Sequence, residues 1–154
     1  MQARESPGAV THKVAGGCHC GNITVRLQLA RAPDTYRPRS CDCDFCRKHC
    51  ACYLSDPQGA LIIQVRDDNE CGRYRQGSGA ADFLVCRNCG VLVVALYRGE
   101  QKLYATVNAS ALDAGTRFGA EQPVSPQKLS QDEKIKRWQQ LWFSDVEFSG
   151  SADM

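Results

Sequence analysis

Residues 81–97 read ADFLVCRNCGVLVVALY, in which the turn Cys86-Arg87-Asn88-Cys89-Gly90 separates two short apolar runs. Short runs rich in Val, Leu and Phe, bounded by turn residues, predict β-strands, here over Ala81–Val85 and Val91–Tyr97. A C-x-x-C turn presents two sulfur atoms together, and Gly90 suits its tight backbone. The stretch therefore predicts two strands joined by part of a metal site.

Two further cysteine groups stand earlier in the chain, and they read Cys18-His19-Cys20 and Cys41-Asp42-Cys43-Asp44-Phe45-Cys46. Residues i and i+2 of a regular strand share a face, so Cys18 and Cys20 are expected to bind one ion. Seven thiolates do not divide into two closed four-coordinate zinc sites, because a structural zinc has four protein ligands and a catalytic zinc keeps one position open. We therefore predict a closed site on Cys18, Cys20, Cys86 and Cys89, and an open, catalytic site on Cys41, Cys43 and Cys46.

Other ligand sets fit the same composition, since the chain contains ten cysteines and three histidines. A further cysteine (Cys50, Cys52 or Cys71) would close the second site and make it purely structural, and His19 or His49 would also serve as a ligand. All-thiolate sites suit iron as well as zinc. Disulfides or buried free thiols are the alternatives without a metal.

The rest of the chain predicts a mainly β fold of short antiparallel strands with little helix. Ile23, Val25, Leu27 and Leu29 alternate with polar residues, which is the pattern of a strand with one buried face. Further short strands are expected over Ala60–Val65, Lys102–Val107 and Leu141–Phe148. One helix is expected over Ser130–Gln140, because Ser130 and Glu133 have the spacing of a capping box.

The composition of the two chain ends predicts the boundaries of the domain. Residues 1–15 are predicted to be a flexible leader and residues 149–154 a frayed tail, on either side of a single zinc-binding domain over residues 16–148. A chain of 154 residues with 43% hydrophobic residues has room for one core. Trp138, Trp142 and Phe143 form an apolar group that is expected to pack against it.

Charge and hydropathy exclude several classes of protein. The net charge of +2 is too small to indicate nucleic-acid binding. No apolar run approaches the roughly 20 residues of a membrane span. The start, Met-Gln-Ala-Arg-Glu-Ser-Pro-Gly, lacks the apolar stretch of a secretory signal, so a reducing, cytoplasmic location is expected.

A locally basic group surrounds the central motif, and it consists of Arg37, Arg39, Arg47, Lys48 and His49. Such groups hold carboxylates by charge-assisted hydrogen bonds. Arg47 and Lys48, which follow Cys46 directly, are the predicted cofactor-binding residues. A solvated surface cluster is the alternative interpretation. Asp42 and Asp44, between the predicted ligands, either orient a substrate and accept a proton or are exposed turn residues.

The three cysteine motifs together resemble the glutathione-dependent formaldehyde-activating enzyme family, which includes the centromere protein V domain. The resemblance runs from about Gly16 to about Leu112 and includes Gly16-Gly17 before the first motif and Arg47-Lys48 after the second. It implies an Mss4-like, mainly β fold with two zinc ions. It also implies carbon–sulfur lyase activity, in which the thiol of glutathione adds to formaldehyde or the adduct is split in reverse.

Two departures from the family pattern affect the expected chemistry. Cys50-Ala51-Cys52 replaces a small Gly-Ala pair, and the arginine common before the third motif is absent from Ala81-Asp82-Phe83.

The sequence supports two hypotheses for the function. The first hypothesis is a zinc enzyme that binds a glutathione-like thiol and a small aldehyde. The second is a non-catalytic, zinc-stabilised module that binds a protein or chromatin.

Overall fold

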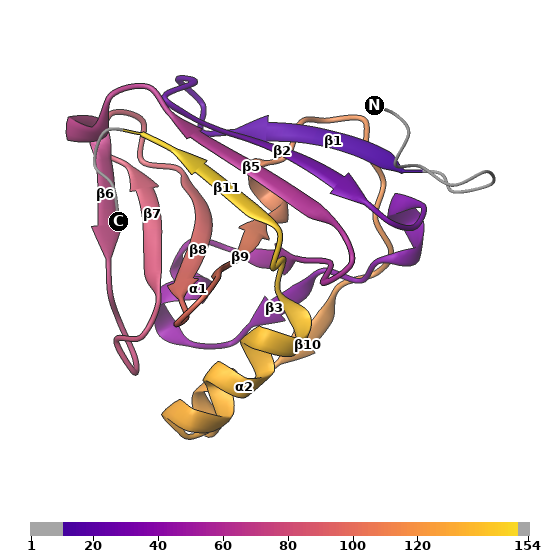
Figure 1. The fold of residues 1–154 in the computed structure, drawn as a ribbon, viewed down its shortest axis with the longest axis vertical. Coiled ribbons are helices and arrows are strands. Elements are labelled where there is room, and N and C mark those ends of the chain that lie inside the picture. The colour runs from indigo at the N-terminus through magenta and orange to yellow at the C-terminus, as the bar shows by residue number, and fades with distance from the viewer. Residues whose placement is uncertain (1–10, 151–154) are drawn as a thin grey trace.

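The computed structural model describes residues 11–150, which contain eleven strands in two sheets and two α-helices (Figure 1). The first sheet has the order β1-β2-β5-β11 and the second the order β10-β3-β4-β9-β8-β7-β6. The strand bounds are β1 His12–Gly17, β2 Ile23–Leu29, β3 Arg39–Cys41, β4 Cys52–Leu54, β5 Ala60–Val65, β6 Cys71–Tyr74, β7 Asp82–Cys86, β8 Leu92–Arg98, β9 Leu103–Asn108, β10 Gln122–Val124 and β11 Val146–Ser149. The helices are α1 Asp44–Lys48 and α2 Gln131–Leu141. The prediction of a mainly β fold is confirmed.

The core lies between the two sheets. The alternating residues of β2 are at most 1% exposed, as their period of two predicted: Ile23, Val25, Leu27 and Leu29. They pack with Val94 and Leu96 of β8 from the second sheet. All five residues from Leu92 to Leu96 are buried, so β8 is covered on both faces.

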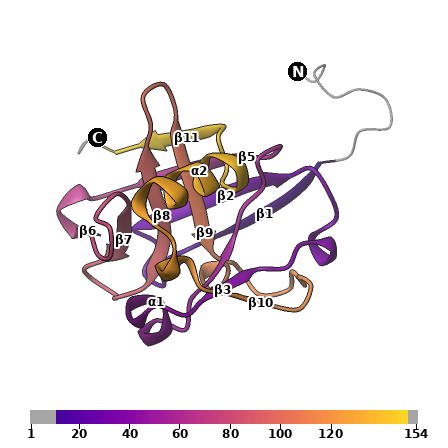
Figure 2. The same cartoon turned by 90° about the horizontal axis from the view of Figure 1, so that it is seen from below.

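The helix α2 covers part of the outer face of the second sheet, where Figure 2 shows it lying across β8 and β9. It starts at a complete capping box, because Ser130 Oγ accepts from Glu133 N at 3.1 Å and Glu133 Oε1 accepts from Ser130 N at 2.8 Å. Trp138 stacks on Trp142 with ring centroids 4.8 Å apart, and Phe143 is fully buried. The helix predicted over Ser130–Gln140 and the packing of its apolar group are confirmed.

Two details of the predicted strands are wrong. The last strand was expected over Leu141–Phe148, but the chain divides this stretch between the two sheets. Phe143 makes an isolated bridge with Ala105 of β9, and β11 then pairs with β5. The strands were also expected to be antiparallel, whereas β10–β3 and β11–β5 are parallel pairs.

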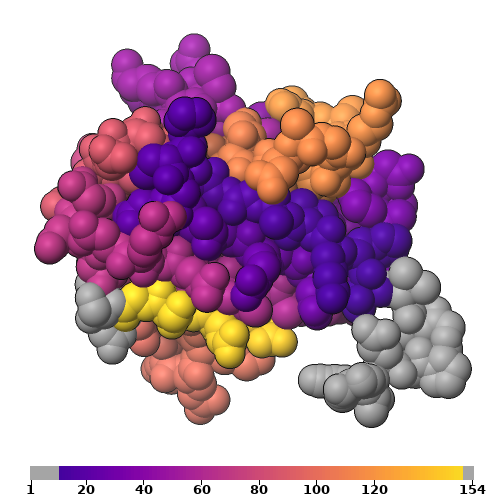
Figure 3. Space-filling view, turned by 90° about the horizontal axis from the view of Figure 1, so that it is seen from above, coloured from indigo at the N-terminus to yellow at the C-terminus, as the bar shows by residue number. Residues whose placement is uncertain are grey.

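The predicted leader also ends too late, because β1 begins at His12 and pairs antiparallel with β2 from His12↔Leu29 to Gly17↔Thr24. Ser149 belongs to β11 rather than to a tail. The other leader and tail residues, 1–10 and 151–154, lie outside the described residues. Figure 3 shows the outer face of the first sheet, with β11 in yellow along its edge. No helix within residues 11–150 has the length and apolar character needed to cross a membrane.

Candidate metal centres and the adjoining cavity

The first group of cysteines joins the two sheets. Cys18 and Cys20 lie in the turn between β1 and β2, whereas Cys86 is the last residue of β7 and Cys89 lies in the turn between β7 and β8. Their four sulfur atoms lie within 4.8 Å of one another. We call Cys18, Cys20, Cys86 and Cys89 the four-cysteine cluster. A metal held there would tie a hairpin of the first sheet to a hairpin of the second.

The donor set fits a tetrahedral zinc ion. Zinc–sulfur bonds of about 2.3 Å place tetrahedral sulfur atoms about 3.8 Å apart. The Cys18–Cys20 sulfur distance is 3.8 Å and the Cys20–Cys86 distance is 3.6 Å. Backbone N–H groups also point at the sulfur atoms, from Ile23 to Cys18 at 3.2 Å and from Cys89 to Cys86 at 3.5 Å. These contacts stabilise negative charge on the thiolates that zinc requires.

The backbone at this cluster differs in one respect from the prediction. Cys18 and Cys20 were expected to share the face of a strand, but β1 ends at Gly17 and the pair lies in a turn. Gly21 and Gly90, which follow the two motifs, have φ of 87° and 84°. Glycine adopts such values without steric cost. The turn, rather than the strand, therefore brings Cys18 and Cys20 together.

The second group consists of Cys41, Cys43 and Cys46, whose sulfur atoms also lie within 4.8 Å of one another. We call it the three-cysteine cluster. Cys41 ends β3, Cys43 is the N-cap residue of α1, and Cys46 lies within that helix and is 2% exposed. Cys43 Sγ accepts from Cys46 N at 3.5 Å, so the sulfur itself caps the helix. The sequence did not predict α1, because this five-residue helix has no apolar period.

Hydrogen bonds link the sulfur atoms of the three-cysteine cluster to each other and to Tyr53. The hydrogen bond with Cys46 lowers the pKa of Cys41 to about 6, whereas the same bond and burial raise the pKa of Cys46. Tyr53 Oη lies 3.1 Å from Cys46 Sγ, and burial raises the pKa of this phenol. Tyr53 therefore stays protonated and can donate to a thiolate at Cys46.

Among residues 11–150, no further Cys, His, Asp or Glu ligand atom joins the three-cysteine cluster within the same 4.8 Å. Cys50 is exposed, Cys52 is buried beside Ser110, and Cys71 is buried opposite Cys86 in the β6–β7 pair. The His49 ring packs on Phe45 with centroids 4.7 Å apart. The structure therefore does not bring these alternative ligands, or His19, into the cluster.

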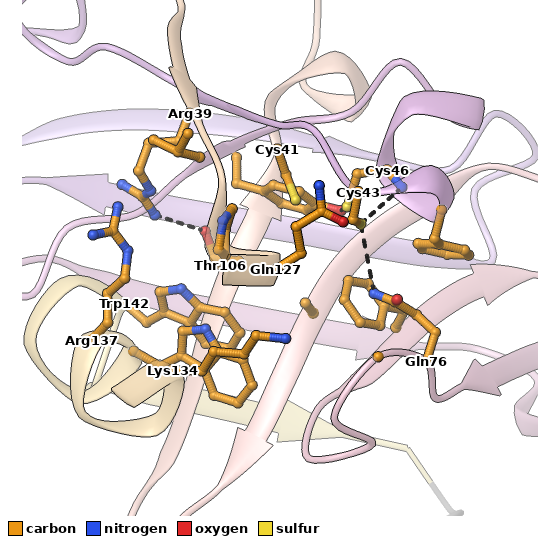
Figure 4. A pocket seen from close by; sticks show the side chains of 18 of the residues that line it. Arg39, Cys41, Cys43, Cys46, Gln76, Thr106, Gln127, Lys134, Arg137 and Trp142 are labelled. Carbon is orange, nitrogen blue, oxygen red and sulfur yellow. Dashed lines mark hydrogen bonds between the residues drawn. The ribbon is translucent and has the colours of Figure 1, made fainter. Parts of the chain in front are cut away.

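A cavity of about 300 Å³ opens beside the three-cysteine cluster (Figure 4). Its lining includes all three cysteines and, from α2 and the residue after it, Trp138 and Trp142. Tyr53, Phe45 and Phe83 add further aromatic surface, and Gln76 Nε2 approaches Cys43 Sγ at 4.0 Å. No residue of the four-cysteine cluster lines this cavity. The two clusters thus have different surroundings.

Among the described residues, Arg39, Lys134 and Arg137 are the cations that line the cavity, and Asp44 is the lining carboxylate. Burial, together with the charge of Arg137, lowers the pKa of Arg39 to about 10. Arg39 Nη2 donates to Ser55 Oγ at 2.7 Å and lies 3.5 Å from Thr106 Oγ1. The cavity is therefore a positively charged pocket with an apolar floor.

The structure separates the basic residues that the sequence grouped together. Arg39 lines the cavity, whereas Arg47 and Lys48 are exposed at the end of α1 and are not part of its lining. Arg37 donates to the backbone carbonyls of Ala120 and Glu121 at 3.0 and 3.2 Å. Lys134 and Arg137 were missed, and the available signal was their i, i+3 spacing on the predicted helix, with Trp138 beside them.

The two aspartates of the central motif have different surroundings. Asp42 accepts hydrogen bonds from Ser125 Oγ at 2.5 Å and Gln127 Nε2 at 3.1 Å, and Gln127 lines the cavity. Asp42 therefore anchors the segment that precedes α2 beside the cysteines. Asp44 is exposed and lines the cavity directly.

The fold and these residues define a class of protein: a mainly β protein with two cysteine clusters that could each hold a metal ion, one of them in a cavity wall. The sequence model of the family described as glutathione-dependent formaldehyde-activating enzyme matches residues 13–128. The chain therefore belongs to the glutathione-dependent formaldehyde-activating enzyme family, as its three motifs indicated.

The other comparisons add support for the fold. A protein of Rhodobacter sphaeroides with a crystal structure is 22% identical, with a TM-score of 0.50. The match covers 88% of this chain and 99% of that protein. No curated protein matches the chain.

Proposed function

We propose that this protein is a zinc-dependent carbon–sulfur lyase-type enzyme that handles a glutathione-like thiol and a small aldehyde, or their S-hydroxyalkyl adduct. One observation carries the proposal: the cluster with three cysteines lines a cavity, and the cluster with four does not. A structural zinc has four protein ligands, and a catalytic zinc keeps a position for substrate. The membership of the family supports the same substrates.

The chemistry requires a sulfur nucleophile at neutral pH. A zinc ion held by Cys41, Cys43 and Cys46 would bind the thiol of the cosubstrate as a thiolate. In the forward direction a carbon–sulfur bond forms between the thiol sulfur and the carbonyl carbon, and the carbonyl oxygen takes up the proton that the thiol loses. In the reverse direction the same bond breaks and the hydroxyl proton returns to sulfur. No oxidant or reductant is required.

The residues of the chain have three tasks in this proposal. Tyr53 holds Cys46 in place through its hydroxyl group, 3.1 Å from the sulfur. Trp138 and Trp142 exclude water from one side of the cavity, which strengthens the electrostatic interactions inside it. Asp44, beside the cluster and in contact with solvent, is placed to exchange the proton between the hydroxyalkyl oxygen and water.

The test measures the interconversion of glutathione plus formaldehyde with S-hydroxymethylglutathione by exchange NMR, with the uncatalysed rate subtracted. We expect acceleration by the zinc-loaded protein and its loss in Cys43→Ser. The matched control is Cys50→Asn, which removes an exposed thiol outside both clusters. Asn tolerates the φ of 50° at that position.

Two results would contradict the proposal. The first is equal acceleration by the protein and by Cys43→Ser. The second is no acceleration by protein whose metal sites are filled, which would favour the alternative of a non-catalytic protein- or chromatin-binding module. A cytoplasmic location is part of the proposal, because all ten cysteines are free and their function requires reduced thiols.

A further inference from the structure

We infer that Arg39 and Arg137 together bind a carboxylate of the thiol cosubstrate, so that α2 determines which thiols the cavity accepts. We call this pair the two-arginine site. The inference rests on the proposed function, since it concerns the cosubstrate of the same cavity. It assigns to this helix a role in specificity that the cysteine motifs do not contain.

The first argument is charge balance. Within residues 11–150, the ion pairs join Arg73 and Arg75 to Asp82, and no carboxylate is paired with Arg39 or Arg137. Both guanidinium groups line the cavity, and Figure 4 shows them turned toward each other at the end opposite the three cysteines. Two partly buried cations that face each other repel, and an anion between them removes the repulsion.

The second argument is the anchoring of the helix. Arg39 Nη2 donates to Ser55 Oγ at 2.7 Å, and Ser55 Oγ donates to the carbonyl of Leu141 at 2.7 Å. Leu141 is the last residue of α2, and Arg137 lies four residues before it, on the same helix face. One chain of hydrogen bonds therefore fixes the end of α2 relative to Arg39 and keeps Arg137 beside it.

The third argument is reach. Arg39 and Cys41 are two residues apart on β3, so their side chains leave the same face with Cα atoms about 7 Å apart. A thiol bound at the cluster could therefore carry a carboxylate to the arginines only if several bonds separate the two groups. Cysteinyl peptides satisfy this requirement, and simple alkyl thiols do not. Two planar guanidinium groups suit a carboxylate, because each can donate two parallel hydrogen bonds to it.

The helix α2 lies outside the segment that the family model matches. The family match ends at residue 128, and α2 begins at Gln131. Arg137 and Lys134 therefore lie outside the matched segment, whereas Arg39 and the cysteines lie within it. The proposed site therefore combines an arginine from the matched segment with an arginine from the helix that follows it.

The experiment measures binding through tryptophan fluorescence. Trp138 and Trp142 are the two tryptophans of the sequence, and both line the cavity. The probes are glutathione, S-methylglutathione (which keeps both carboxylates and has no thiol) and glutathione diethyl ester (which has neither carboxylate ionised). Zinc-loaded protein is compared with Arg137→Met and Arg137→Lys. Lys136→Met is the matched control, because Lys136 is exposed on the same helix.

We expect Arg137→Met to weaken binding of glutathione and of S-methylglutathione about 10- to 100-fold, the range for hydrogen bonds to charged groups. The affinity of Arg137→Lys is expected to fall between those of the wild type and of Arg137→Met, because lysine keeps the positive charge but lacks the planar guanidinium group. Lys136→Met should change affinity less than about threefold. The diester should bind the wild type weakly, and its affinity should fall little further in Arg137→Met.

Several outcomes would overturn the two-arginine site. One is an equal loss of affinity for glutathione and for the diester in Arg137→Met. A second is unchanged binding in Arg137→Met and Arg137→Lys, with the loss appearing in Arg47→Met instead. If turnover of glutathione and formaldehyde persists in that case, the proposed function stands without this site. Conversely, binding of S-methylglutathione that depends on Arg137, without turnover of glutathione and formaldehyde, would support the two-arginine site and contradict the proposed reaction.

Discussion

The four-cysteine cluster lies where hairpins from two different sheets meet, whereas the three-cysteine cluster lies in the wall of a cavity. Both use C-x-C and C-x-x-C spacings. The first gathers its ligands from two cysteine pairs that are at least 66 residues apart in the sequence, so a metal there holds distant parts of the fold together. The second gathers them from one short segment, Cys41 to Cys46. The comparison teaches that the spacing of the cysteines predicts where a metal site lies. The location of that site in the fold then indicates whether the metal would be structural or catalytic.

The largest expected difference is in folding. Cys86→Ser should abolish the cooperative thermal transition, because metal binding at the four-cysteine cluster is coupled to the joining of the sheets. The loss is expected to be comparable to the whole free energy of unfolding of such a domain, about 5–15 kcal/mol. Cys43→Ser should keep a cooperative transition, because the ligands of the three-cysteine cluster come from one short segment and do not join the two sheets. Differential scanning calorimetry of both variants makes the measurement. Thermal transitions of equal temperature and cooperativity in the two variants would contradict the assignment of different roles to the two clusters.

Metal removal should follow the same order. A zinc chelator is expected to take the ion from the three-cysteine cluster first, because three protein ligands hold zinc less firmly than four. One equivalent should leave without change in far-UV circular dichroism, and the second only as the protein unfolds. Simultaneous release of both equivalents would contradict this order.

A smaller effect is expected at Tyr53. Tyr53→Phe removes the hydroxyl group 3.1 Å from Cys46 Sγ and should weaken zinc binding at the three-cysteine cluster about 10- to 100-fold. The control is Tyr36→Phe, which removes a hydroxyl group that donates to Asp56 Oδ2 at 2.5 Å, away from both clusters. Chelator competition gives the affinity. A similar loss in both variants would show that the contact with Cys46 is not the cause.

The smallest effect tests the turn of the four-cysteine cluster. Gly90→Ala should cost about 1–2 kcal/mol, because φ is 84° and an added Cβ meets nothing within 4 Å. Gly79→Ala, at φ 76° and equally open, is the control and should cost the same. Urea unfolding of the zinc-loaded proteins gives both values. A much larger loss in Gly90→Ala, with loss of zinc, would mean that the turn depends on more than its backbone conformation.

Local patterns in the sequence predicted the parts of the fold that depend on near neighbours. The period of two in β2 and the capping box at Ser130 are properties of adjacent residues, and both are confirmed. The grouping of the cysteines followed from ligand number, and the structure brings the same seven residues together in the same two sets. In contrast, β3, β4 and β10 have three residues each, too few for a periodic signal.

The cavity could not be predicted in the same way. Arg137 and Lys134 are about 90 residues from the central motif, and they reach the cavity because α2 packs across the second sheet and is anchored through Ser55. Long-range packing of this kind leaves only a weak trace, the shared face of Lys134, Arg137 and Trp138. Arg47 and Lys48 were favoured because they adjoin Cys46, but the helix α1 directs them away from the lining.

The central claim is that one cluster is closed and the other accepts a thiol. The most direct measurement is zinc content per chain under reducing conditions, followed by zinc-edge X-ray absorption during titration with glutathione. The account predicts two zinc ions per chain and an average of about 3.5 sulfur ligands per zinc, which rises to about 4 as glutathione binds. One zinc per chain, or two whose sulfur shell ignores glutathione, would contradict it.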